Sequence, residues 1–165
     1  MFDRFYRSYR RIFATNAGWA PLAVRIPVGI IFIAHGAQKL FGWFGGYGLE
    51  ATGQAFASMG LNPGLLMALL AGSAEFFGGA LLVAGFLVRP AGALLAFTMF
   101  VAIFAAHFQS GLFLSNGGYE YALALLAVSM ALSISGAGRA SVDDWLAKRQ
   151  VAIGRAEPVI AEGLA

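Results

Sequence analysis

The sequence predicts an all-α membrane protein: a four-transmembrane-helix antiparallel bundle, with both termini in the cytoplasm and an amphipathic interfacial helix at its N-terminus. Four apolar stretches each approach the roughly 20 residues that a helix needs to cross a bilayer. The basic residues between these stretches fall almost entirely on one side of the predicted bundle. The composition agrees, because the 165 residues are 59% hydrophobic and 12% charged, with a mean hydropathy of +0.74. Soluble domains carry about 25% charged residues, so an ordinary soluble domain is excluded.

The predicted spans, in chain order, run from Pro21 to Phe41, Pro63 to Phe86, Pro90 to Phe108 and Gly118 to Ile134. Each span except the last begins at a proline, which is tolerated in the first turn of a helix. Between the first two spans, Leu49 to Met59 is expected to form a short surface helix that ends at a glycine.

The chain is expected to form a single membrane domain with three parts. Residues 1–18 form an interfacial helix, because apolar side chains recur there at helical spacing with arginines between them. Residues 19–137 form the four-span bundle, and residues 138–165 form a cytoplasmic tail. In the tail, Ser141 followed by Asp144 resembles a capping box that starts a short helix.

The distribution of basic residues predicts the orientation. The loops 42–62 and 109–117 contain neither Lys nor Arg. Outside the spans, basic residues lie before the first span, in the link after the second and in the tail: Arg4, Arg7, Arg10, Arg11, Arg89, Arg139, Lys148, Arg149 and Arg155. The positive-inside rule therefore places both termini in the cytoplasm, in an inner membrane of the bacterial type. The net charge of +3 reflects this topology, so nucleic acid is not an expected partner.

Five ionisable residues inside or at the ends of the spans require an explanation, because a charge at mid-membrane costs about 2.5 to 3.5 kcal/mol. Glu75 and His35 are the candidate catalytic residues. The candidate ligand-binding residues are His35, Lys39, Glu75, His107 and Glu120. A rise of about 1.5 Å per residue places both histidines in the outer leaflet, with Lys39 one turn above His35 and Glu75 deepest. We expect these side chains to converge around one polar cavity that opens outward.

Each of these residues also has a structural interpretation. Lys39 can extend its ammonium to the outer headgroups, and Glu120 can be an interfacial carboxylate that pairs with Lys39 or His107. Glu75 can be a protonated hydrogen-bond donor that only fixes the packing. Arg25, near the inner end of the first span, is favoured as a structural charge.

Four motifs occur in order along the spans: His-Gly-Ala-Gln-Lys-Leu-Phe-Gly at 35–42, Glu-Phe-Phe-Gly-Gly-Ala-Leu-Leu-Val-Ala-Gly at 75–85, Gly-Gly-Tyr-Glu at 117–120 and Gly-Ala-Gly-Arg-Ala-Ser-Val-Asp at 136–143. With this order and spacing, the chain resembles the DoxX family of small four-helix integral membrane proteins over about residues 20–145. The resemblance implies relatives linked to thiosulfate:quinone oxidoreductase, to membrane oxidoreductase complexes in oxidative stress and to quinol oxidoreductase-like proteins. It carries over, without an assigned role, the motif positions His35, Lys39, Glu75, Glu120, Arg139, Ser141 and Asp143.

The leading hypothesis is a redox-associated membrane subunit, such as a subunit of a quinone-linked oxidoreductase, that binds a quinone-like or other small ligand in the outer half of the bundle. A quinone needs an apolar slot with donors and proton carriers at its oxygens, which His35 or His107 with Glu75 can supply. The alternatives are a proton-coupled small-solute transporter, in which Glu75 binds the proton, and a structural or assembly subunit of a larger membrane complex. The expected partners are the lipid bilayer and either further copies of the chain or a larger membrane redox complex.

The sequence does not identify a cofactor, and a quinone is the leading candidate. The sequence contains no cysteine, which excludes disulfides, iron–sulfur clusters and thiol chemistry within the chain. Haem ligation by His35 and His107, or a metal site formed by these residues and Glu120, is disfavoured because histidines on different helices without fixed spacing are a weak signal. Both remain open from the sequence.

Overall fold

The computed structural model describes residues 13, 15 and 17–149. The interfacial helix predicted over residues 1–18 and the end of the tail after residue 149 therefore lie largely outside the described residues. The described part of the chain consists of helices and loops, without a strand. Its long helices are α2 (Ala20–Phe41), α4 (Gly64–Ala84), α5 (Val88–Ala102) and α6 (Glu120–Ser135).

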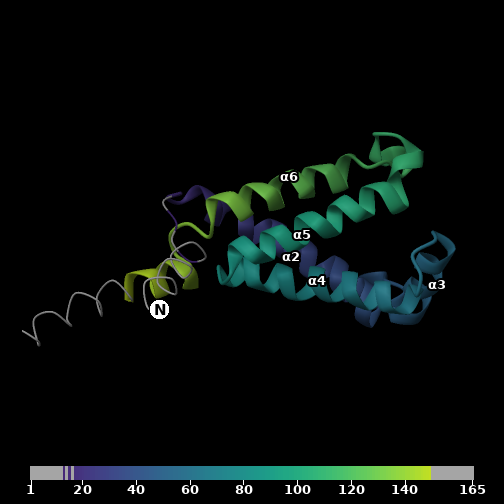
Figure 1. Cartoon of the computed structure of the whole chain (residues 1–165), viewed down its shortest axis with the longest axis horizontal. Helices are drawn as coiled ribbons and strands as arrows, with labels where there is room; N and C mark the ends of the chain where they lie inside the picture. Colours follow the sequence, from purple (N-terminus) through teal and green to yellow (C-terminus); the bar gives the residue numbers. More distant parts are fainter. Residues whose placement is uncertain (1–12, 14, 16, 150–165) are drawn as a thin grey trace, which may run out of the picture.

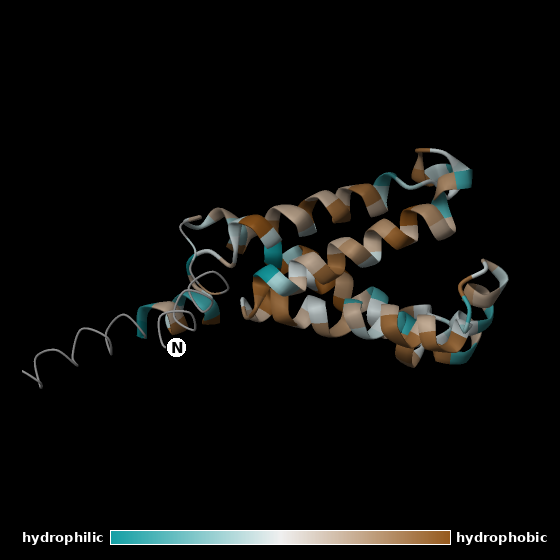
Figure 2. Cartoon of the chain, viewed as in Figure 1, coloured by the Kyte–Doolittle hydropathy of each residue, from teal (hydrophilic) through white to brown (hydrophobic). Residues whose placement is uncertain are grey.

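Three stretches among the described residues are long and apolar enough to cross a membrane: Ala20–Phe41, Gly64–Ala84 and Val88–Ser110. Helix α6 has 16 residues, fewer than the roughly 20 that a perpendicular span needs. The prediction of an all-helical membrane protein is therefore confirmed. The described residues contain three helices of sufficient length, and α6 is a shorter apolar helix that would be the fourth. Apolar residues make up most of these helices (Figure 2), and many of their large apolar side chains are exposed, as expected for contact with lipid.

The helices form two antiparallel hairpins, α2 with α4 and α5 with α6, joined by the tight turn after Ala84 (Figure 1). We call one end of the bundle the loop end. It carries α3 (Gly48–Ser58) and the short helical turns η1 (Trp43–Gly45), η3 (Phe108–Ser110) and η4 (Leu114–Asn116). We call the opposite end the basic end. It carries Arg89 and the helical residues 142–149. Helix α3 matches the surface helix predicted over Leu49 to Met59.

Small residues allow the backbones of α2 and α4 to approach each other closely. A Cβ atom on Gly79 would lie 2.6 Å from the carbonyl oxygen of Gly29, so a larger side chain does not fit there. On the other side of α4, a Cβ atom on Gly78 would meet the side chain of Leu95 at 3.0 Å. Gly78 and Leu95 therefore mark where the two hairpins pack against each other.

Arg25 links segments at the basic end of the bundle through hydrogen bonds. Its side chain is 1% exposed. The guanidinium group donates hydrogen bonds to four carbonyl oxygens, those of Leu82 and Val83 at the end of α4 and those of Ala137 and Ala140 after α6. Because helix ends leave backbone carbonyls with few intrahelical donors, the guanidinium group joins the last turn of α4 to the segment after α6 through these carbonyls. This contact supports the structural interpretation of Arg25.

The carboxylate of Asp143 binds backbone amides at the start of α5. Its carboxylate accepts hydrogen bonds from the backbone amides of Leu87 at 2.8 Å and Val88 at 3.1 Å. Burial raises the pKa of the Asp143 carboxyl group, against the opposing effect of these amides and of Arg25 and Arg89. The predicted cap of the following helix is also confirmed, since the amide of Asp144 donates to the Ser141 hydroxyl at 3.1 Å.

Candidate functional site

A cavity of about 880 Å³ lies between the two hairpins toward the loop end. We call it the main cavity. It is lined by α2, α4, α5 and α6, by the π-helical segment η2 (Ile103–His107) and by residues of the α3 segment. Most of its lining side chains are apolar; the polar and ionisable ones are His35, Lys39, Ser73, Glu75, Thr98, His107 and Tyr121.

Lys39 and Glu75 form an ion pair on the wall of the main cavity. The ammonium nitrogen of Lys39 lies 2.6 Å from a carboxylate oxygen of Glu75, and the two side chains are 23% and 4% exposed. A Cβ atom on Gly72 would lie 3.3 Å from the Cβ of Lys39, which places Lys39 opposite Gly72, nearly one turn from Glu75. The Lys39 side chain therefore extends inward to the carboxylate and not outward to the headgroups.

His35 lies beside Tyr121 of α6. The centroids of the two rings are 6.0 Å apart, and the ring planes are inclined by 51°. Both residues line the main cavity, so the tyrosine adds a hydroxyl group to the polar side chains of His35, Lys39 and Glu75. Sequence reasoning missed Tyr121, because a tyrosine near the end of a span is usually an interfacial anchor.

His107 lines the main cavity at the end of η2. Its Nδ1 atom lies 2.8 Å from the carbonyl oxygen of Gly117. Because a carbonyl oxygen only accepts, this contact requires the proton on Nδ1 and leaves Nε2 as an acceptor in the neutral ring. The π-helical geometry around His107 was not predicted; such segments are frequent at functional sites.

Glu120 lies outside the lining of the main cavity. One of its carboxylate oxygens accepts a hydrogen bond of 2.6 Å from the backbone amide of Leu114, which begins η4. The structure thus separates Glu120 from the other four candidate residues and gives it a contact that orders the loop. The expectation that all five surround one cavity fails at this position, because the first turn of α6 directs the carboxylate to the loop.

The depths also differ from those expected. Since Gly78 packs on Leu95, the antiparallel helices place Thr98 level with Glu75, and His107 lies roughly 13 Å closer to the loop end. His35, in contrast, is level with Glu75, because its neighbour Gly36 packs between Gly72 and Phe76 of α4. The two histidines therefore do not share a level. Counting residues from the start of each span ignores how the helices are offset and tilted.

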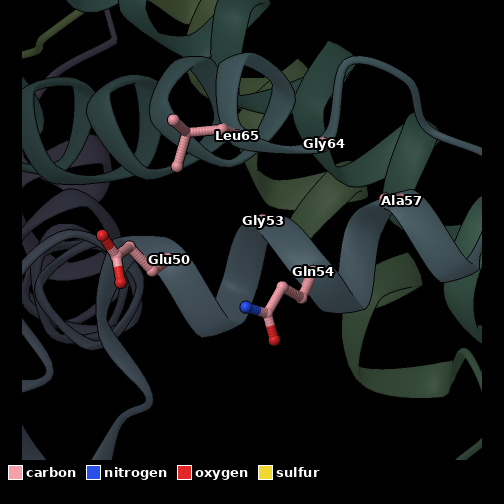
Figure 3. Close-up of a pocket in the computed structure, with 6 residues that line it drawn as sticks. All are labelled: Glu50, Gly53, Gln54, Ala57, Gly64 and Leu65. Atoms are coloured by element: carbon pink, nitrogen blue, oxygen red, sulfur yellow. The ribbon is translucent and has the colours of Figure 1, made fainter.

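A second, smaller hollow of about 290 Å³ lies between α3 and α4 (Figure 3). It occurs where Gly53 of α3 packs closely against Gly64 and Leu65 of α4. The side chains of Glu50 and Gln54 lie at its edge and are exposed. We interpret this hollow as a packing groove, and Glu50 serves below as a carboxylate outside the main cavity.

Residues 20–108 match the family model DoxX, and this region includes His35, Lys39, Glu75 and His107. The chain is similar to a protein of Bacillus subtilis (strain 168) that bears the name "Putative oxidoreductase CatD". The two are 34% identical over 112 residues, which make up 68% of this chain and 77% of that protein. No solved structure matches the chain.

Proposed function

Because the chain belongs to the DoxX family of membrane proteins, we propose that it is a redox-associated integral membrane subunit that binds a quinone-like ligand in the main cavity. The observation that carries this proposal is the Lys39–Glu75 ion pair on the wall of a largely apolar cavity. The name of the Bacillus subtilis relative, an oxidoreductase, agrees with a role in redox chemistry.

The residues around the ion pair suit a quinone. Its ring needs apolar walls and its two oxygens need hydrogen-bond donors, which the ammonium of Lys39, the imidazole of His35 and the hydroxyl of Tyr121 can supply. Reduction of a quinone to a quinol consumes two electrons and two protons. In the proposed site Lys39 and Glu75 would carry the two protons to the bound oxygens, His35 would donate a hydrogen bond to the ligand, and the electrons would come from a partner oxidoreductase. This partner defines the larger membrane complex that we propose.

The closed end of the main cavity favours binding over transport. On the basic side of Glu75, Phe32, Leu95 and Leu132 pack in the apolar core and are at most 2% exposed, so they form an apolar floor toward the basic end. A transporter would have to open this floor between α2, α5 and α6. A site that is closed on one side agrees better with a ligand that binds and leaves by the same route.

We further propose that the basic end faces the cytoplasm of a bacterial-type inner membrane. The loops at the opposite end contain neither Lys nor Arg, whereas Arg89, Arg139, Lys148 and Arg149 lie at the basic end. Such asymmetry orients membrane proteins with the basic side inward. The main cavity then lies in the outer half of the bilayer.

The test is binding of menadione, a naphthoquinone without a tail, to the purified chain in lipid nanodiscs by isothermal titration calorimetry. We expect Glu75→Gln and Lys39→Met each to weaken binding at least tenfold, which is about 1.4 kcal/mol. Glu50→Gln, which changes a carboxylate outside the main cavity, should bind as the wild type does. Equal affinities in all four proteins would refute the proposed site. The folding of each variant is checked by circular dichroism before titration.

A further inference from the structure

The main cavity continues to the lipid-facing surface between α4 and α5. The two helices touch at Gly78 and Leu95, and beyond this contact they diverge toward the loop end (Figure 1). Leu70 of α4 and Phe97 of α5 line the cavity and yet are 55% and 65% exposed. Side chains that are both lining and exposed mark a lateral opening of the cavity.

The other approaches to the cavity are less suited to a water-soluble molecule. On the side between α2 and α6, the rings of His35 and Tyr121 bridge the two helices. At the loop end, the lining is mostly apolar, with Phe56, Met59 and Leu114 near His107. A polar solute would lose most of its hydration at this largely apolar rim, where His107 offers it little hydrogen bonding in return.

From this geometry we infer that the ligand is an amphiphile dissolved in the membrane, with its polar head at the Lys39–Glu75 pair and its apolar tail running out between Leu70 and Phe97 into the lipid. This inference rests on the proposed function and specifies its substrate class. The tail exchanges one apolar environment for another, so access from the bilayer avoids the hydration cost of the loop end. The head finds the charged and hydrogen-bonding groups of the inner wall.

The test compares menadione with a naphthoquinone that carries a short isoprenoid tail. Both are added to nanodiscs that contain the full chain, and affinities are expressed per mole fraction in the lipid, so that partitioning into the bilayer does not count as binding. The wild type should bind the tailed probe at least tenfold more tightly than menadione. Equal affinities would overturn the inference and leave the proposed function standing. No binding of either probe would overturn the proposed function and the inference with it.

Ala71→Phe tests the route itself, because Ala71 lines the cavity on α4 beside Leu70. We expect this variant to lose at least tenfold in affinity for the tailed probe, and a clearly smaller factor for menadione. The matched control is Ala80→Phe, which places the same ring on the exposed surface of α4 and should leave both affinities unchanged. Unchanged binding of the tailed probe in Ala71→Phe, or equal losses for both probes, would overturn the inference. If Ala71→Phe does not fold, Val101→Trp tests the same opening from α5 by the same criteria.

Discussion

Lys39 on α2 and Glu75 on α4 form a 2.6 Å ion pair that links the two helices of one hairpin and also provides the charged part of the main cavity. An unpaired carboxylate at this depth would be costly, because its surroundings offer little solvation. The pair therefore serves both packing and binding. Stability and ligand affinity can be separated by changing the partners one at a time and together.

Removing one partner should destabilise the protein more than removing both. We expect Lys39→Met to lower the free energy of unfolding by about 2 to 4 kcal/mol, because it leaves the Glu75 carboxylate without its charge partner. The double variant Lys39→Met with Glu75→Gln should recover at least half of this loss, since no buried charge remains. The measurement is unfolding in sodium dodecyl sulfate monitored by circular dichroism. Additive losses would show that the two residues act independently.

The close packing of α2 and α4 predicts different effects of the same change at adjacent positions. Gly79→Ala should lower the free energy of unfolding by roughly 1 to 3 kcal/mol, because the new methyl group would lie 2.6 Å from the backbone oxygen of Gly29. Gly78→Ala meets only the side chain of Leu95 at 3.0 Å or more, and that side chain can shift. Its effect should be within about 1 kcal/mol of neutral, since alanine also favours the helix. Equal effects would contradict the close approach of the two backbones at Gly79.

Arg25 should not be replaceable by lysine. The guanidinium group reaches four carbonyl oxygens in two segments, and an ammonium group cannot span this set. We expect Arg25→Lys to lower the free energy of unfolding by about 2 kcal/mol or more, as a loss of charged hydrogen bonds to buried groups. The control is Arg139→Lys at an exposed position near the same end, which should be nearly neutral. Unfolding of both variants under identical conditions gives the comparison.

Glu120 should affect the loop more than the ligand. Because its carboxylate accepts a hydrogen bond from the Leu114 amide and lies outside the cavity lining, Glu120→Ala should change menadione affinity less than threefold. The same variant should expose the loop around η4 to faster amide hydrogen exchange. A tenfold loss of menadione affinity with unchanged amide hydrogen exchange would show that Glu120 belongs to the binding site.

The orientation can be tested with reporters. A reporter fused after Ala165 should be active only when it remains in the cytoplasm, and a tag inserted beside Gly48 should be accessible from outside intact cells. Moving positive charge to the loop end by Gln54→Lys and Gln109→Lys should reduce the fraction of correctly oriented chains. An external reporter after Ala165 in the wild type would refute the proposed topology.

The sequence by itself determined the class of the protein and most of its helices. Apolar length and composition suffice for this, since lipid requires every backbone polar group of a span to be satisfied within the helix. The predicted stretch Pro21 to Phe41 became Ala20–Phe41, and the surface helix and the cap at Ser141 were found close to their predicted positions. The sequence also singled out Glu75 and Lys39, because charges in apolar stretches are costly wherever they point.

The tertiary structure decided which of these charges meet. Residue counting placed Lys39 above His35 and Glu75 below both, whereas the packing of glycines in α2 and α4 brings the Lys39 ammonium to Glu75. It also brought Tyr121 to His35 and turned Glu120 toward the loop. The physical reason is that the offset, tilt and rotation of helices depend on interhelical contacts between side chains that are distant in sequence. Local hydropathy fixes which segments become helices, but it contains no information about their relative register.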